Sequence, residues 1–131
     1  MVREPGVLPV VLIVDSDVGF VCWLGELLAQ AGAQAIPALN GRDAVRLVAH
    51  LDLHVDVAIV DPSVQGVTEA IDVLRDQYPS LRTIAVRSPG QSVTHAIGAK
   101  HILERPDSNR LSRQEYLRNV RQVLKSARAA A

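Results

Sequence analysis

The stretch VLPVVLIVDSD, residues 7–17, decides the fold class. An almost entirely apolar, β-branched run leads here directly into Asp15, Ser16 and Asp17. A short run of this kind is typical of a strand buried on both faces of a parallel sheet. It is far shorter than the ~20 residues of a membrane helix. It also lacks a small-residue cleavage site, so we interpret it as a strand and not as a signal peptide.

The composition places the chain among ordinary globular domains. Its 131 residues are 48% hydrophobic and 21% charged, which excludes a disordered tail. One cysteine excludes an internal disulfide framework and a multi-cysteine zinc module. We expect a single cytoplasmic domain over residues 1–131, with a core at about 7–125 and a frayed Ala-rich end.

Strand and helix patterns alternate along the rest of the sequence. The apolar stripes at helical spacing predict helices after the first, second, third and fifth strands, and Ser92–Ile97 allows one very short helix after the fourth. We expect Asn40-Gly41 to turn the chain and Pro37 to mark an edge strand. The predicted strands are Val7–Val14, Gln34–Ala38, Val55–Val60, Thr83–Val86 and His101–Leu103. Such alternation predicts a parallel α/β sheet covered by helices on both faces.

In open parallel sheets, ligands bind beyond the carboxyl ends of the strands. Three carboxylates, one or two guanidinium groups and some hydroxyls are expected to meet there. Carboxylate clusters suit hard cations such as Mg²⁺, and a carboxylate can also act as a nucleophile. The residues that follow strands are Asp15, Ser16, Asp17, Asp61, Ser63, Arg87, Ser88 and Arg105.

Three segments together resemble the receiver domains of two-component response regulators. VLIVDSD (residues 11–17) resembles their acidic first-strand motif, and VDVAIVDPSVQG (55–66) resembles their third strand with its phosphoacceptor. GAKHILERP (98–106) resembles the motif around their fifth strand. The resemblance covers roughly residues 7–124 and implies a flavodoxin-like (βα)5 sheet with strand order 2-1-3-4-5.

The resemblance also assigns candidate roles. It implies that Asp61 is the phosphoacceptor and that Asp15, Asp61 and the carbonyl of Ser63 are metal ligands, with Asp17 nearby. Arg87 or Ser88 would occupy the position that senses the phosphoryl group. Ile102 stands at the aromatic switch position, and Arg105 replaces a near-universal lysine.

Several departures from the family pattern predict atypical behaviour. Ser16 stands where the family has its main metal-binding aspartate, so we expect at most weak Mg²⁺ binding. Arg105 carries a planar fork that could clamp a phosphoryl group or pair with Asp61 in place of the metal. Ile102 is expected to stay packed in a short buried strand, which would remove the usual switch.

Plainer interpretations of the same residues remain open. Asp15 and Asp17 could only cap the first helix, and Asp61 could be a structural residue held by Arg105. Cys22 is expected to be packed in the first helix. The four histidines, at positions 50, 54, 95 and 101, show no metal-ligand spacing.

The leading functional hypothesis is a receiver-like domain in phosphorelay signalling, without enzymatic turnover of its own. Its partners would be a histidine kinase or phosphotransfer protein and a downstream protein or a second copy, and not nucleic acid or a membrane. One alternative is a pseudo-receiver that docks partners without phosphorylation. A less favoured alternative is a small flavodoxin-like cofactor-binding domain, for which the sequence offers no glycine-rich loop and only 3% aromatic residues.

The charge is unevenly distributed, although the net charge is zero. The segment from residue 110 onward has six basic residues and one acid, hence +5, which leaves −5 for residues 1–109. This segment could be a solvated final helix or a docking face for an acidic partner. The basic residues are Arg110, Arg113, Arg118, Arg121, Lys125 and Arg128.

Overall fold

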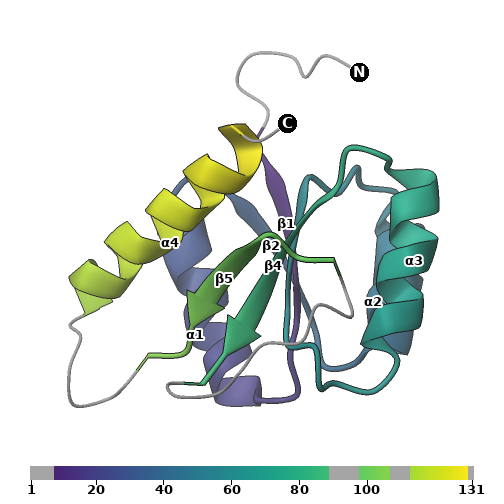
Figure 1. Ribbon diagram of the computed structural model, residues 1–131, viewed down its shortest axis with the longest axis horizontal. Coiled ribbons are helices and arrows are strands. Elements are labelled where there is room, and N and C mark those ends of the chain that lie inside the picture. The colour runs from purple at the N-terminus through teal and green to yellow at the C-terminus, as the bar shows by residue number, and fades with distance from the viewer. Residues whose placement is uncertain (1–7, 89–97, 107–112, 130–131) are drawn as a thin grey trace.

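Five parallel strands form a sheet with helices on both faces (Figure 1). The computed structural model describes residues 8–88, 98–106 and 113–129. The strands are β1 (Val10–Val14), β2 (Gln34–Ala38), β3 (Val57–Val60), β4 (Arg82–Arg87) and β5 (His101–Glu104). The described helices are α1 (Val18–Gln30), α2 (Gly41–Leu51), α3 (Val67–Gln77) and α4 (Arg113–Ala129).

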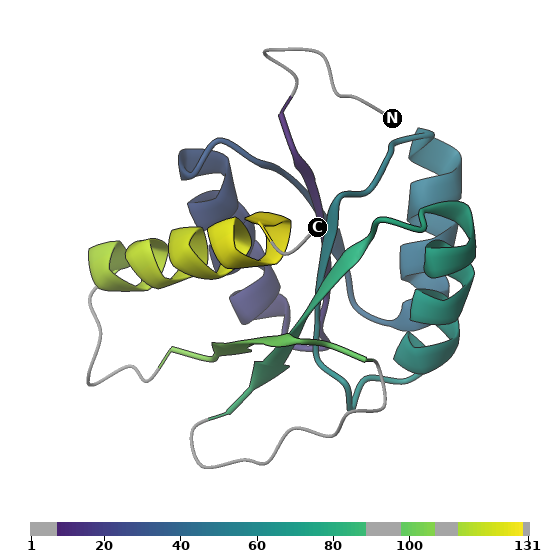
Figure 2. The ribbon, with the colours of Figure 1, turned by 45° about the horizontal axis from the view of Figure 1, so that its top comes forward.

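The strand order is β2-β1-β3-β4-β5, which confirms the flavodoxin-like prediction. The two most apolar strands, β1 and β3, lie side by side, and their register pairs Val14 with Val60. Helices α1 and α4 cover one face of the sheet, and α2 and α3 cover the other (Figures 1 and 2). The predicted short helix at Ser92–Ile97 lies outside the described residues.

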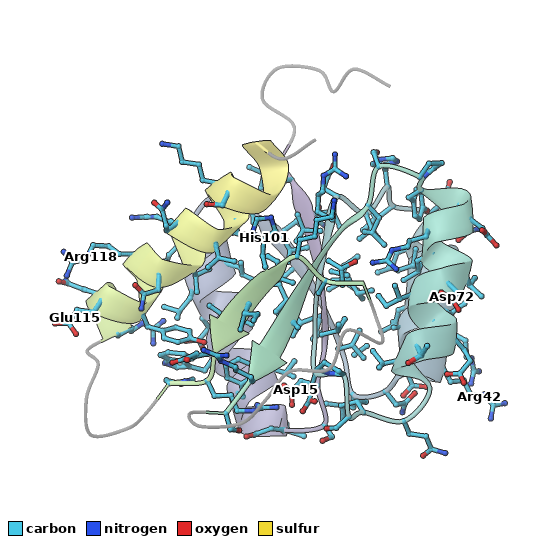
Figure 3. All side chains as sticks on the ribbon, in the orientation of Figure 1. Asp15, Arg42, Asp72, His101, Glu115 and Arg118 are labelled. Carbon is cyan, nitrogen blue, oxygen red and sulfur yellow. The ribbon has the colours of Figure 1, made fainter. Side chains whose placement is uncertain are left out.

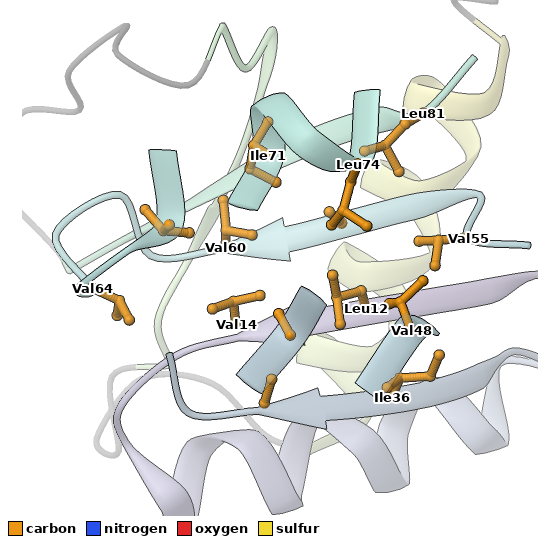
Figure 4. Packing of buried hydrophobic residues seen from close by; sticks show 14 of the residues in the cluster. Leu12, Val14, Ile36, Val48, Val55, Val60, Val64, Ile71, Leu74 and Leu81 are labelled. Atoms are coloured by element: carbon orange, nitrogen blue, oxygen red, sulfur yellow. The ribbon is translucent and has the colours of Figure 1, made fainter. Parts of the chain in front are cut away.

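Two apolar layers hold the helices to the sheet. Alternate residues of each strand point to opposite faces, so Leu12 and Val14 pack toward α2 and α3, and Ile13 packs toward α1 and α4. Figure 4 shows the first layer, in which Ile71 and Leu74 of α3 meet the strands. Because β1 is buried along its whole length, its end is a rigid base for the residue that follows.

Local sequence signals explain the helix ends. Asp17 caps α1 by accepting the Phe20 N–H at 3.1 Å, which is one of the roles that the sequence left open for it. Gly32 follows the end of α1 with φ of 83°, which favours glycine. The chain bends at Asn40 on its way from β2 into α2, as predicted, and the Asn40 side-chain oxygen accepts the Asp43 N–H at 2.8 Å and caps α2.

One prediction about the first helix is wrong. Cys22 is exposed and not packed, because the buried stripe of α1 passes through other positions of the helix. The buried residues of α1 are Phe20, Val21, Leu24, Leu27 and Leu28. No helix in the described ranges is long and apolar enough to cross a membrane.

Candidate functional site

Asp15 and Asp61 lie side by side at the carboxyl edge of the sheet. Each follows the last residue of its strand, and those last residues, Val14 and Val60, are paired in the parallel register. The Asp61 N–H donates to the Val14 carbonyl at 2.9 Å, which extends the ladder by one residue. Figure 3 shows Asp15 at this edge. The predicted adjacency of these two residues is therefore confirmed.

Strand alternation also directs Arg105 toward the same place. Val14 and Val60 belong to the layer against α2 and α3, so the next residue on each strand starts toward the opposite face. Leu103 of β5 packs in the layer against α1 and α4, and Arg105, two residues later, shares that side. The three charged residues therefore emerge on one face, although β4 separates β5 from β3.

Arg105 bridges the two carboxylates with one nitrogen. Its Nη2 donates to Asp15 Oδ2 at 2.6 Å and to Asp61 Oδ2 at 2.8 Å. The guanidinium carbon lies 4.9 Å from the centroid of the Phe20 ring, which supports it by a cation–π contact. Nη1 is buried and has no hydrogen-bond partner in the described part of the chain. Short, charge-assisted bonds of this kind are among the strongest in proteins.

The remaining oxygens of both carboxylates are also occupied. Asp61 Oδ1 accepts the backbone N–H of Ser63 at 2.9 Å and its hydroxyl at 2.7 Å. Asp15 Oδ1 accepts the Asp17 N–H at 2.9 Å. Every carboxylate oxygen of Asp15 and Asp61 thus accepts a hydrogen bond from the protein itself. Asp15 is fully buried and Asp61 is partly exposed.

Burial shifts the pKa values of the charged residues in this cluster. It raises the pKa of Asp15, and this effect outweighs the hydrogen bonds from Asp17 and Arg105 that favour the ionised form. Burial also opposes the charge of Arg105, but bonding and attraction to Asp15 and Asp61 prevail and raise its pKa. The cluster therefore keeps a cationic arginine between two carboxylates, one of which is strongly desolvated.

Ser16 and Asp17 do not join the cluster of side chains. Asp17 uses its carboxylate to cap α1, which was the plainer interpretation of this residue. Ser16 is exposed. The acidic motif at the end of β1 thus delivers one carboxylate to the carboxyl edge of the sheet.

The fourth strand turns its terminal cation away from the carboxylates. Arg87 is paired with Glu104 in the register of β4 and β5, and its Nη2 lies 2.7 Å from Glu104 Oε1. Alternation places Ser88, and not Arg87, on the face that carries Asp15. Glu104 was missed in the sequence, although its opposite charge at a paired position was the available signal.

The expectation that Ile102 stays packed is wrong. Its exposed fraction is 41%. It lies in the edge strand β5 and faces the side of the sheet opposite Leu103, which is the residue that packs against α1 and α4. Ile102 therefore presents an aliphatic side chain to the surface at the edge of the sheet.

Two glycines fix the loop that follows Asp61. The Gly41 N–H donates to the Gln65 carbonyl at 3.0 Å. A Cβ on Gly41 would lie 2.0 Å from the carbonyl oxygen of Gly66, so the start of α2 presses directly on this loop. Sequence reasoning missed this contact because the two glycines are distant in the chain, and neither local pattern shows that they meet.

The residues present do not fit a Mg²⁺ ion as they are arranged. Arg105 Nη2 occupies the position between the two carboxylates where a shared cation would sit. No group of three or more acidic, histidine or cysteine side chains suited to a metal occurs among the residues that the structure describes. A cation would have to displace Arg105 and would gain only two carboxylates.

Structural comparison identifies the fold. Similar solved structures include a chemotaxis response regulator, CheY4 of Vibrio cholerae, at TM-score 0.63 and 23% identity, covering 89% of this chain and 99% of that chain. A signal receiver domain of an HD domain-containing protein from Pseudomonas fluorescens Pf-5 aligns at TM-score 0.68 and 21% identity, covering 94% and 99%. A CheY-like receiver domain protein from Methanospirillum hungatei JF-1 aligns at 0.65 and 18%, covering 95% and 100%.

The chain has the receiver-domain fold. By sequence, it matches no protein-family model and no curated protein. In this receiver fold, the carboxyl edge carries Asp15, Asp61 and Arg105 in contact. Ser63 bonds to Asp61, whereas Arg87 pairs with Glu104.

Proposed function

We propose that this chain is a receiver-type signalling domain with Asp61 as its candidate phosphoacceptor, and that it acts mainly as a phosphorylation-independent docking module. The receiver fold and the position of Asp61 at the end of β3 support the first part. The bridge from Arg105 to both carboxylates supports the second.

The bridge argues against ready phosphorylation for a chemical reason. A carboxylate attacks phosphorus with an oxygen lone pair, and both oxygens of Asp61 already accept strong hydrogen bonds. An incoming phosphoryl group would also have to open an ion pair that neutralises the desolvated Asp15. We therefore propose that Mg²⁺ binding is weak and that transfer from a phosphohistidine to Asp61 is slow.

We propose a histidine kinase or phosphotransfer protein as the upstream partner and a further protein or a second copy as the downstream partner. Helix α4 offers exposed cations, Arg118 and Lys125, for association with an acidic surface (Figure 3 labels Arg118). Arg113 is engaged with Glu26 at 3.1 Å. Steering by exposed charges raises association rates and weakens with added salt.

The decisive experiment is intact-mass spectrometry after incubation with a small acyl phosphate and Mg²⁺. We expect little phosphorylated wild-type protein and more in Arg105→Lys, because a lysine lacks the planar guanidinium that stacks on Phe20 and so holds the bridge to the carboxylates less firmly. Asp61→Asn is the control for the modified residue. Rapid and complete phosphorylation of the wild type at Asp61 would support the second candidate, a conventional phosphoacceptor, which the partial exposure of Asp61 favours.

A further inference from the structure

A polar pocket lies at the opposite edge of the sheet from the carboxylate cluster, where β4 and β5 begin. It has a volume of about 140 Å³, and its lining includes Arg75, Arg82, Thr83, Lys100 and His101. Figure 3 shows His101 at the edge of the sheet away from Asp15. The pocket is therefore separate from the carboxylate cluster.

The charged residues that line this pocket are all basic. Three cations from three different elements or their flanks converge on it, and no acidic residue is among its lining residues. The dipole at the carboxyl end of α3 accounts for Arg75 in the last turn of that helix, but not for Arg82 or Lys100. Like charges held together around a concave site create a field that attracts an anion.

Neighbouring groups leave hydrogen-bond donors available in this pocket. Arg82 Nε is buried and has no hydrogen-bond partner in the described ranges. Thr83 Oγ1 accepts a bond from Arg75 Nη2 at 3.0 Å, so the hydroxyl hydrogen remains to be donated. The acid next to β4, Asp56, directs Oδ2 to the Val10 N–H at 2.7 Å and does not line the pocket.

We propose that this pocket binds the phosphate group of a small anion. Guanidinium groups match phosphate oxygens in charge and planar geometry, and a lysine adds a mobile point charge. The group would accept from Arg82, Lys100 and the Thr83 hydroxyl, with the charge of Arg75 nearby. The domain would then carry an anion site at the amino edge of the sheet, and β4 would connect this site to the carboxyl edge. Anion binding there would be independent of any event at Asp61.

The test is a nuclear magnetic resonance titration of the protein with inorganic phosphate, against chloride at matched ionic strength. We expect saturable shifts of the Thr83, Lys100 and His101 amides with a dissociation constant of about 1 mM. Arg82→Gln should weaken binding about tenfold, the usual effect of one charged hydrogen bond. The matched control is Arg42→Gln, which removes the same charge from an exposed position at the start of α2, distant from His101 (Figure 3).

A second arm distinguishes two sources of the phosphate group. Tighter binding of glycerol 1-phosphate than of inorganic phosphate would identify a phosphorylated metabolite, and the reverse would identify the free ion. If Arg82→Gln does not fold, the exposed Lys100→Gln replaces it. The proposal is overturned if phosphate gives no saturable shifts at these amides, or if binding is unchanged in the pocket variant. Neither result depends on the phosphorylation of Asp61.

Discussion

Replacing Arg105 by methionine should destabilise the domain strongly at neutral pH. The substitution keeps an apolar side chain over Phe20 and removes both bonds to the carboxylates, at 2.6 and 2.8 Å. Asp15 is fully buried and would be left without its counter-charge. Removing one partner of a buried pair typically costs ~3 kcal/mol or more. For a domain of this size, such a loss lowers the melting temperature by roughly 10 °C.

The effect of Arg105→Met should depend on pH with a definite sign. Burial already raises the pKa of Asp15 above its ordinary value of 3.8, and loss of the arginine would raise it further. The folded state of the variant then binds the Asp15 proton more tightly than the unfolded state does. The loss of stability caused by ionised Asp15 is therefore complete above the pKa of Asp15 in the folded state. This loss disappears as the pH falls toward the pKa of Asp15 in the unfolded state. The difference between wild type and variant should therefore shrink in acid.

Urea unfolding followed by the fluorescence of Trp23 measures this difference. Trp23 is the single tryptophan, and its ring packs 4.8 Å from that of Tyr116. The double variant Arg105→Met, Asp15→Asn should recover most of the loss, since asparagine keeps an oxygen for the Asp17 N–H and has no charge. A loss below ~1 kcal/mol at pH 7, or one that does not change with pH, would refute the buried-pair argument.

Three further outcomes follow from the surroundings of single residues. Gly41→Ala should cost ~2 kcal/mol in urea unfolding, because its Cβ would meet the Gly66 carbonyl at 2.0 Å; an unchanged midpoint would contradict the close approach. Cys22 should react with an aromatic disulfide reagent in the native protein as fast as in urea, and slow native labelling would contradict its exposure. Arg87→Gln should change the stability by less than ~0.5 kcal/mol, because its pair with Glu104 is exposed; a larger loss would indicate a role in the carboxylate cluster.

The strand pattern was enough to predict the sheet and the meeting of Asp15 with Asp61. A short, continuous apolar stretch is typical of a central strand, and neighbouring parallel strands end at the same edge of the sheet. The exposure of Ile102 was not predictable in the same way. The predicted strand order already placed the fifth strand at the edge, but the apolar pair Ile102 and Leu103 did not show which of the two side chains faces the helices.

The bridge by Arg105 shows the limit of reading a site from local sequence. The sequence offered two uses for this residue, a phosphoryl clamp or a counter-ion for Asp61, and the structure contains the counter-ion arrangement. The contact with Asp15, 90 positions earlier, depends on the face from which Arg105 emerges and on support from Phe20. Phe20 lies in the buried stripe of α1, and helical spacing alone indicates only a core role for it.

Calorimetric titration with Mg²⁺ tests most directly the claim that Arg105 closes the carboxylate pair. The wild type should give no saturable binding below ~10 mM, because the ion must displace a bridging guanidinium and gains few carboxylate ligands. Ser16→Asp, which adds a carboxylate, and Arg105→Lys, which weakens the bridge, should each strengthen binding. Tight binding by the wild type that neither substitution changes would contradict the claim.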